Sequence, residues 1–168
     1  MQVLELHISI GLQISRKVKC MTVHASVWDL DRFVEAHDRV YASVLAELTA
    51  GRKTSHWMWF IFPQLKELGR SPIAKHFGIA SRNEALAYWQ HPLLGQRLRN
   101  CTALMLAAGE HSAHDILGSP DDLKFRSCMT LFAQVVPDEI LFNQALKQFF
   151  GGNPDDKTIQ LLQTPQTN

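Results

Sequence analysis

The amino-acid sequence predicts an all-α protein: a single compact domain of about seven helices with an extra N-terminal extended segment. Apolar residues recur with the period of a helix from Asp29 onward, and Gly, Pro and capping residues divide the chain at helical spacing. Hydrophobic residues make up 46% and charged residues 20% of the 168 residues, which is typical of a globular chain with one core. We expect residues 27–163 to form the helical domain, residues 1–26 a peripheral extension, and residues 164–168 a frayed tail.

The first residues of the chain alternate between apolar and polar side chains. Leucine or isoleucine occupies every even position from Leu4 to Ile14, and this period of two is typical of a β-strand. The sequence offers no partner strand downstream, and a lone strand is unstable. Two interpretations stay open: residues 1–20 are an extension that precedes an ordinary start at Met21, or the strand pairs with a partner chain.

Helix start signals divide the remainder of the chain. Ser81, followed by Glu84 at the third helical position, predicts a capping box. Proline suits the first turn of a helix, so His91-Pro92 and Ser119-Pro120 each predict a helix start, with Ser119 as the cap of the second. The expected helices cover about residues 29–50, 71–77, 81–90, 92–108, a single turn at 112–118, 119–136, 137–150 and 153–163.

Charge and cysteine content exclude several classes of partner. With 17 Lys+Arg against 16 Asp+Glu, the net charge of +1 predicts neither nucleic acid nor membrane as a partner. The 3 cysteines lack metal-ligand spacing, so we expect no metal, no cofactor and reduced thiols in the cytoplasm.

The basic residues near the N-terminus follow the apolar stretch, which is the wrong order for a signal peptide. We expect a monomer or weak homodimer whose partner is a small molecule.

Residues 55–64, Ser-His-Trp-Met-Trp-Phe-Ile-Phe-Pro-Gln, are unusually aromatic. Such a segment is either central core or the wall of a ligand pocket, and the two roles are compatible. His56 is a candidate general acid or base, and the indole of Trp57 or Trp59 is a candidate surface for stacking on a base. The three side chains cannot all face one pocket in either a strand or a helix. We therefore expect His56 toward a cavity and at least one indole in the core.

A second group of polar residues stands at the expected helix start near residue 120. Capping explains Asp121 and Asp122 without any function. The functional alternative has Asp122 and Lys124 pointing inward with Ser127 toward a ligand, because a partly buried Asp–Lys pair shifts both pKa values and marks a site. His91 has the same two interpretations, acid/base catalysis or helix capping, and capping is favoured because Pro92 follows it.

Several motifs resemble those of one known family. They are the aromatic segment 55–64, Glu84-Ala85 with residues 91–98, residues 122–124 with 127–132, and residues 150–152. In this order they resemble a bacterial family of helical proteins of unknown function that is often mislabelled "calpastatin", over about residues 29–163. The label implies a calpain inhibitor, but a disordered inhibitory repeat would not have 46% hydrophobic residues.

The chain also resembles, more weakly, the YbiA-like NADAR superfamily. The shared features are an aromatic segment with His, then Glu-Ala, then a helix with Lys and Met. It implies a binder or an N-glycoside hydrolase for a nucleotide- or ADP-ribose-derived small molecule. In that case Glu84 or Asp122 would supply the carboxylate, and Lys124 or Arg97 would meet phosphate. The alternative is a non-catalytic protein-interaction or stress-associated module. A closed cavity lined by His56, Glu84 and Lys124 would favour the enzyme, and an exposed apolar patch at residues 57–62 would favour the module.

Overall fold

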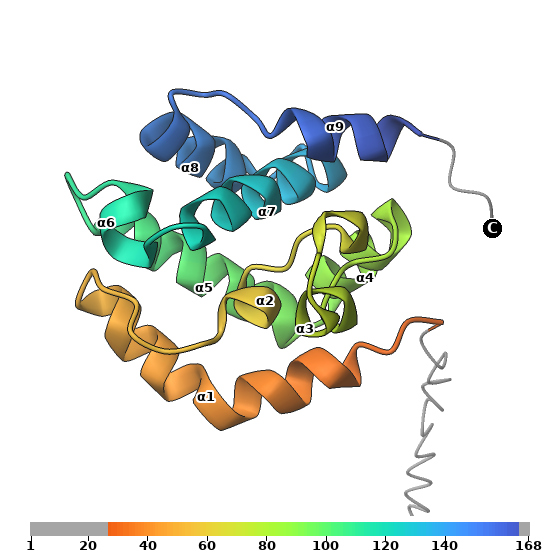
Figure 1. The fold of residues 1–168 in the computed structure, drawn as a ribbon, viewed down its shortest axis with the longest axis horizontal. Helices are drawn as coiled ribbons and strands as arrows, with labels where there is room; N and C mark the ends of the chain where they lie inside the picture. The colour runs from red at the N-terminus through yellow and green to blue at the C-terminus, as the bar shows by residue number, and fades with distance from the viewer. Residues whose placement is uncertain (1–26, 165–168) are drawn as a thin grey trace, which may run out of the picture.

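The computed structural model describes residues 27–164, so the expected N-terminal strand lies outside the described residues (Figure 1). Within these residues the structure is helical and contains no strand, only one parallel bridge between Leu65 and Ile79. The helices are α1 (Asp31–Thr49), α2 (Met58–Ile61), the 3-10 helix η1 (Lys66–Leu68), α3 (Pro72–His76), α4 (Arg82–Gln90), α5 (Leu94–Ala107), α6 (Ala113–Leu117), α7 (Asp121–Val135), α8 (Ile140–Phe150) and α9 (Asp156–Gln163).

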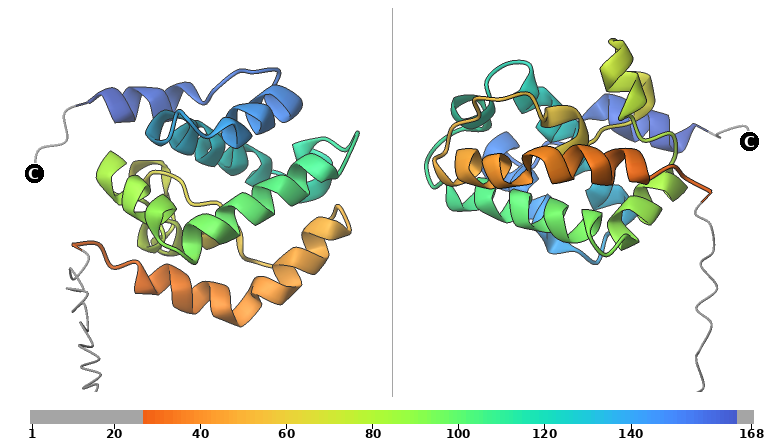
Figure 2. Two further views of the ribbon diagram at one scale, coloured as in Figure 1. Left: turned by 180° about the vertical axis from the view of Figure 1, so that it is seen from behind. Right: turned by 90° about the horizontal axis from the view of Figure 1, so that it is seen from below.

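Two helices organise the domain. Helix α5 packs against α1, α4 and α8, and helix α7 packs against α4, α6, α8 and α9. In Figure 1, α1 lies along one edge and α9 along the opposite edge, with α5 and α7 between them; the left view of Figure 2 shows the same order from behind. The predicted all-α fold with one compact domain is therefore confirmed, and the short helix α2 sits between α1 and α5.

Side-chain caps account for several helix starts. Ser112 and Asp115 form a complete capping box at α6, and Asp155 caps α9 by accepting from the amide of Thr158 at 3.0 Å. At α4 only half of the predicted capping box forms. The Ser81 hydroxyl accepts from the amide of Glu84 at 3.1 Å, but the Glu84 carboxylate turns away to other partners.

The number of helices and one cap differ from the expectation. Residues 27–164 contain nine α-helices where about seven were expected, and three of these, α2, α3 and α6, have only four or five residues. Ser119 does not cap α7, which begins at Asp121 with no side-chain cap at its N-cap position. The Asp122 carboxylate accepts from the amide of Leu123 at 2.9 Å, so this acid satisfies one N–H of the first turn of α7.

The turn between α4 and α5 brings backbone unusually close to backbone. His91 Nδ1 accepts from the amides of Leu93 and Leu94, both at 3.3 Å, so the capping interpretation of His91 is confirmed. A Cβ built on Gly95 would lie 1.9 Å from the carbonyl oxygen of Trp89, well inside any van der Waals contact. The two helices can meet this closely only because position 95 carries no side chain.

No helix in the described part of the chain is long and apolar enough to cross a membrane.

Candidate functional site

The aromatic segment begins in the loop after α1 and ends just beyond α2. Trp57 is fully buried, which agrees with the expectation that at least one indole lies in the core. Trp59 is half-buried. His56 is exposed, which differs from the expectation that its ring faces a cavity. A four-residue helix has no stability of its own, so contacts from the rest of the protein must hold this segment.

Glu47, in the last turns of α1, holds the beginning of the segment. Its carboxylate accepts from the amides of Thr54 (2.7 Å) and Ser55 (3.1 Å), from the hydroxyl of Ser55 and from the indole Nε1 of Trp57 (2.9 Å). Burial acts to raise the pKa of Glu47, but these hydrogen bonds outweigh it and lower the pKa to about 2. Glu47 is therefore ionised near neutral pH and serves as a hydrogen-bond acceptor for the segment.

His37, also on α1, holds the end of the segment. Its Nε2 lies 2.7 Å from the carbonyl oxygen of Phe60, and the hydroxyl of Tyr88 donates to the same oxygen at 3.1 Å. The ring of His37 is completely buried, and burial is the main cause that lowers its pKa from 6.5 to about 4. Helix α1 thus supports both ends of the aromatic segment with side chains that sequence analysis did not single out.

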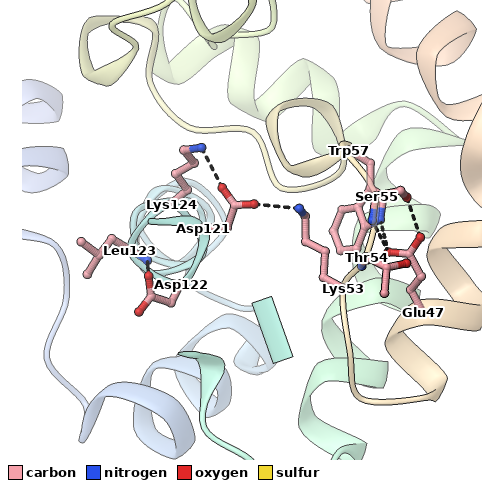
Figure 3. A network of polar contacts seen from close by, with 9 residues as sticks. All are labelled: Glu47, Lys53, Thr54, Ser55, Trp57, Asp121, Asp122, Leu123 and Lys124. Carbon is pink, nitrogen blue, oxygen red and sulfur yellow. Dashed lines mark hydrogen bonds and ion pairs between the residues drawn. The ribbon is translucent and has the colours of Figure 1, made fainter. Parts of the chain in front are cut away.

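A lysine–aspartate cluster lies between this segment and the N-terminus of α7 (Figure 3). We use this name for Lys53, Asp121 and Lys124 with the two indoles beside them. Asp121 accepts from Lys53 Nζ at 2.8 Å and from Lys124 Nζ at 2.7 Å. Lys53 Nζ lies 5.3 Å from the ring centre of Trp57, and Lys124 Nζ lies 5.1 Å from that of Trp59. The cluster therefore joins charges and aromatic faces from segments far apart in the sequence.

The three charged members of the cluster sum to one positive charge. Burial acts to raise the pKa of Asp121, but the bonds from the two lysines outweigh it and lower this pKa. One ionised carboxylate between two ammonium groups leaves a surplus of one positive charge, next to the positive end of the α7 dipole. Each ammonium has three donors, and Asp121 is its only hydrogen-bond partner among residues 27–164. The lysines keep donors for a further acceptor.

The three predicted catalytic residues do not come together. The Glu84 carboxylate is buried, bound to Arg32 at 2.7 Å and to the amide of Ala80 at 2.6 Å. Glu84 lines a hollow of about 340 Å³ whose wall includes neither His56 nor Lys124. Asp122 lies 3.2 Å from Nδ1 of the exposed His114, in addition to its bond with its own helix. The closed cavity that would have favoured an enzyme is therefore not found at these residues.

The remaining predicted ligand-binding residues are engaged with partners outside the cluster. Arg97 binds Asp38 at 2.8 Å, and its guanidinium lies 4.5 Å from the ring centre of Tyr41. Ser127 is buried, and its hydroxyl lies 3.2 Å from the carboxylate of Asp155, the cap of α9. Of the eight predicted site residues, the structure places Trp57, Trp59 and Lys124 in the cluster.

Among the described residues, no group of three His, Cys, Asp or Glu side chains has an arrangement that could hold a metal ion.

We expect Glu47→Ala to lower the free energy of unfolding by about 2 kcal/mol at pH 7, because the buried indole N–H of Trp57 loses its acceptor. The folded pKa of about 2 lies below the ordinary 4.5, so the contribution of Glu47 is present above pH 4.5 and is lost as pH falls toward 2. Urea denaturation of wild type and variant at several pH values measures both effects. Glu35→Ala, an exposed glutamate on the same helix, is the control with little expected change; an equal loss in both variants would contradict this role.

Comparison with known proteins gives two matches. A family model described as "Protein of unknown function (DUF1810)" matches residues 27–162. Among solved structures, the chain is similar to the conserved hypothetical protein Rv1873 from Mycobacterium tuberculosis, with 50% sequence identity and a TM-score of 0.80 over 82% of this chain and 98% of that one. No curated protein matches. Neither description states a reaction, a ligand or a partner.

Proposed function

Because the chain belongs to DUF1810, a family of unknown function, its membership supplies no reaction, and we propose that the protein binds a small anionic molecule of the nucleotide-derived class. One observation carries this proposal. The ammonium groups of Lys53 and Lys124 converge on the single carboxylate of Asp121, beside a half-buried indole. The ligand is proposed to bind on the side of the cluster formed by Lys124 and Trp59.

The charge of the cluster selects the acidic part of the ligand. Lys124 has a side chain 22% exposed, whereas Lys53 is 9% exposed, so Lys124 is the ammonium that a ligand reaches first. A phosphate or carboxylate accepts charge-assisted hydrogen bonds from such a group, which are about twice as strong as neutral ones. Asp121 holds both ammonium groups in place for this contact.

The indoles select the other part of the ligand. Trp57 is fully buried and bound to Glu47, so its face is not open to a ligand. Trp59 is half-buried and is the ring on which a base or another flat group would stack. An acidic group next to a stacking ring matches a nucleotide. The weaker resemblance to the NADAR superfamily favours the same class, including ADP-ribose derivatives.

Binding is a better supported role for the cluster than N-glycoside hydrolysis. Hydrolysis needs a proton donor near the glycosidic nitrogen, and the pKa values of Glu47 and Asp121 are lowered, so both carboxylates are ionised at neutral pH. Glu84 is committed to Arg32. A hydrolase would have to use Asp122, the one predicted carboxylate on the first turn of α7.

The alternative function is a protein-interaction module. Its predicted surface at residues 57–62 is not exposed, since Trp59 is half-buried and the other five side chains are buried. One observation still favours it: Leu123, on the first turn of α7 beside the cluster, is 56% exposed.

We expect Lys124→Ala to weaken binding of AMP or ADP-ribose about tenfold, which corresponds to ~1.4 kcal/mol for one charge-assisted hydrogen bond. The measurement is a nuclear magnetic resonance titration that follows the indole signals, with inorganic phosphate as a third probe and with the ligand spectrum checked for released base. Lys147→Ala, an exposed lysine on α8, is the matched control. If no probe moves the Trp59 signal, or if both variants weaken binding equally, the proposal is wrong and the interaction module is favoured.

A further inference from the structure

Two buried side-chain atoms stand out because they have no hydrogen-bond partner among residues 27–164. They are Nδ1 of His37 and Nη1 of Arg97. The two residues lie on α1 and α5, helices that pack against each other. Buried polar atoms in proteins almost always have a partner, which is another protein group or an ordered water. Two exceptions on facing helices therefore call for one explanation.

Both side chains lie against the same aromatic ring. The ring of His37 is nearly parallel to that of Tyr41, with an interplanar angle of 7° and 6.4 Å between ring centres. The guanidinium carbon of Arg97 lies 4.5 Å from the centre of the Tyr41 ring. The positive charge of Arg97 is also one of the causes that lower the pKa of His37. These contacts place both side chains beside Tyr41, where α1 packs against α5.

The two atoms have opposite hydrogen-bonding needs. His37 Nε2 lies 2.7 Å from the carbonyl oxygen of Phe60, and a carbonyl oxygen only accepts, so Nε2 carries the hydrogen. In the neutral ring Nδ1 then has a free lone pair and needs a donor. Arg97 Nη1 is only a donor and needs an acceptor. Its other terminal nitrogen, Nη2, is occupied by Asp38 at 2.8 Å.

We propose that one internal water molecule binds between α1 and α5, donating a hydrogen to His37 Nδ1 and accepting one from Arg97 Nη1. Water satisfies both atoms because it donates and accepts. An anion would accept from Arg97 but would be repelled by the Nδ1 lone pair. A metal ion would suit Nδ1 but would be repelled by the guanidinium group. Because His37 Nδ1 needs a donor and Arg97 Nη1 needs an acceptor, the two atoms together favour a small neutral molecule.

This water completes a hydrogen-bonded path from the protein surface to the aromatic segment. The path runs from Asp38, whose side chain is 58% exposed, through Arg97, the water and His37 to the carbonyl of Phe60. It links an exposed ion pair on one side of α1 to the segment that carries Trp59. Arg97 then acts on the segment as a positioning residue rather than as the phosphate contact expected from the sequence.

The test has two measurements on the intact protein. In a high-resolution crystal structure we expect one water about 2.7–3.2 Å from both His37 Nδ1 and Arg97 Nη1. A long-range ¹⁵N–¹H spectrum should show His37 as the tautomer protonated at Nε2. A direct bond between Nη1 and Nδ1, two separate waters, no density between the atoms, or a tautomer protonated at Nδ1 would each overturn the proposal.

Matched variants separate the site from a general effect of charge on α5. Arg97→Met keeps an unbranched apolar chain over Tyr41 but removes the donor, and we expect the water to lose its bridging position and the His37 Nδ1 signal to shift. Arg99→Met, an exposed arginine on the same helix, should leave both unchanged. An unchanged Nδ1 signal in Arg97→Met, or the same shift in both variants, would contradict the proposal. The wild-type measurements decide the question even if Arg97→Met does not fold.

Discussion

Replacing Trp57 by alanine should lower the free energy of unfolding by about 3–5 kcal/mol, the usual cost of removing a large buried aromatic side chain. Trp57 is fully buried, its ring packs on Phe62 with 6.2 Å between ring centres, and its indole N–H donates to Glu47. The variant loses apolar contacts, leaves a cavity and frees one acceptor of Glu47. Chemical denaturation monitored by circular dichroism measures the loss.

Two control variants separate these causes. Trp57→Phe keeps most of the ring but removes the N–H, so it should cost about 1–2 kcal/mol. Trp59→Ala removes a half-buried ring and should cost clearly less than Trp57→Ala. If the two alanine variants lose equal stability, the orientation of the aromatic segment is not the one described.

Acidification from pH 6.5 to pH 4 should remove about 3 kcal/mol of stability through His37 alone. Burial, the largest cause, lowers the pKa of His37 from 6.5 to about 4, so the unfolded chain binds the proton first as pH falls. The contribution of neutral His37 to stability is complete above pH 6.5. It is lost as the pH falls toward about 4, the pKa of His37 in the folded protein. The size follows because the pKa falls from 6.5 to about 4, and each tenfold change in proton affinity corresponds to ~1.4 kcal/mol.

The His37 contribution is isolated by comparing variants across this pH range. In His37→Gln the amide can still donate to the Phe60 carbonyl but does not titrate, so the pH-dependent loss should be smaller by this amount. His56→Gln changes an exposed ring and should retain the wild-type pH dependence. Equal pH profiles for wild type and His37→Gln would show that His37 is not the buried neutral group described.

Local signals in the sequence predicted the helix starts that depend on local contacts. Ser81 and Ser112 each bond an amide within three residues, as their sequence motifs indicate. The last helix begins at Asp156, three residues after its expected start, and Asp155 is its cap. Helix α2 and its flanking loop have no such signal. They are held by Glu47, ten residues before Trp57, and by His37, 23 residues before Phe60, so their shape depends on tertiary contacts.

The candidate site was predicted only in part for a related reason. Asp122 was the expected partner of Lys124, but α7 begins at Asp121, and a lysine three residues along a helix shares a face with that acid. Lys53 completes the cluster from a loop after α1, and no short motif connects it to residue 121. Glu84 does not complete its expected capping box, because its carboxylate binds Arg32, which is 52 residues away in the sequence.

The close approach of α4 and α5 has a consequence for how the sequence can vary among relatives. A Cβ at position 95 would lie 1.9 Å from the Trp89 carbonyl oxygen, so even alanine would force the two helices apart. A homologue that keeps this crossing must keep glycine there, whatever its ligand. Glycine after a His-Pro-Leu-Leu turn is therefore a marker of architecture rather than of activity, and a divergent relative lacking it would be expected to join these helices differently.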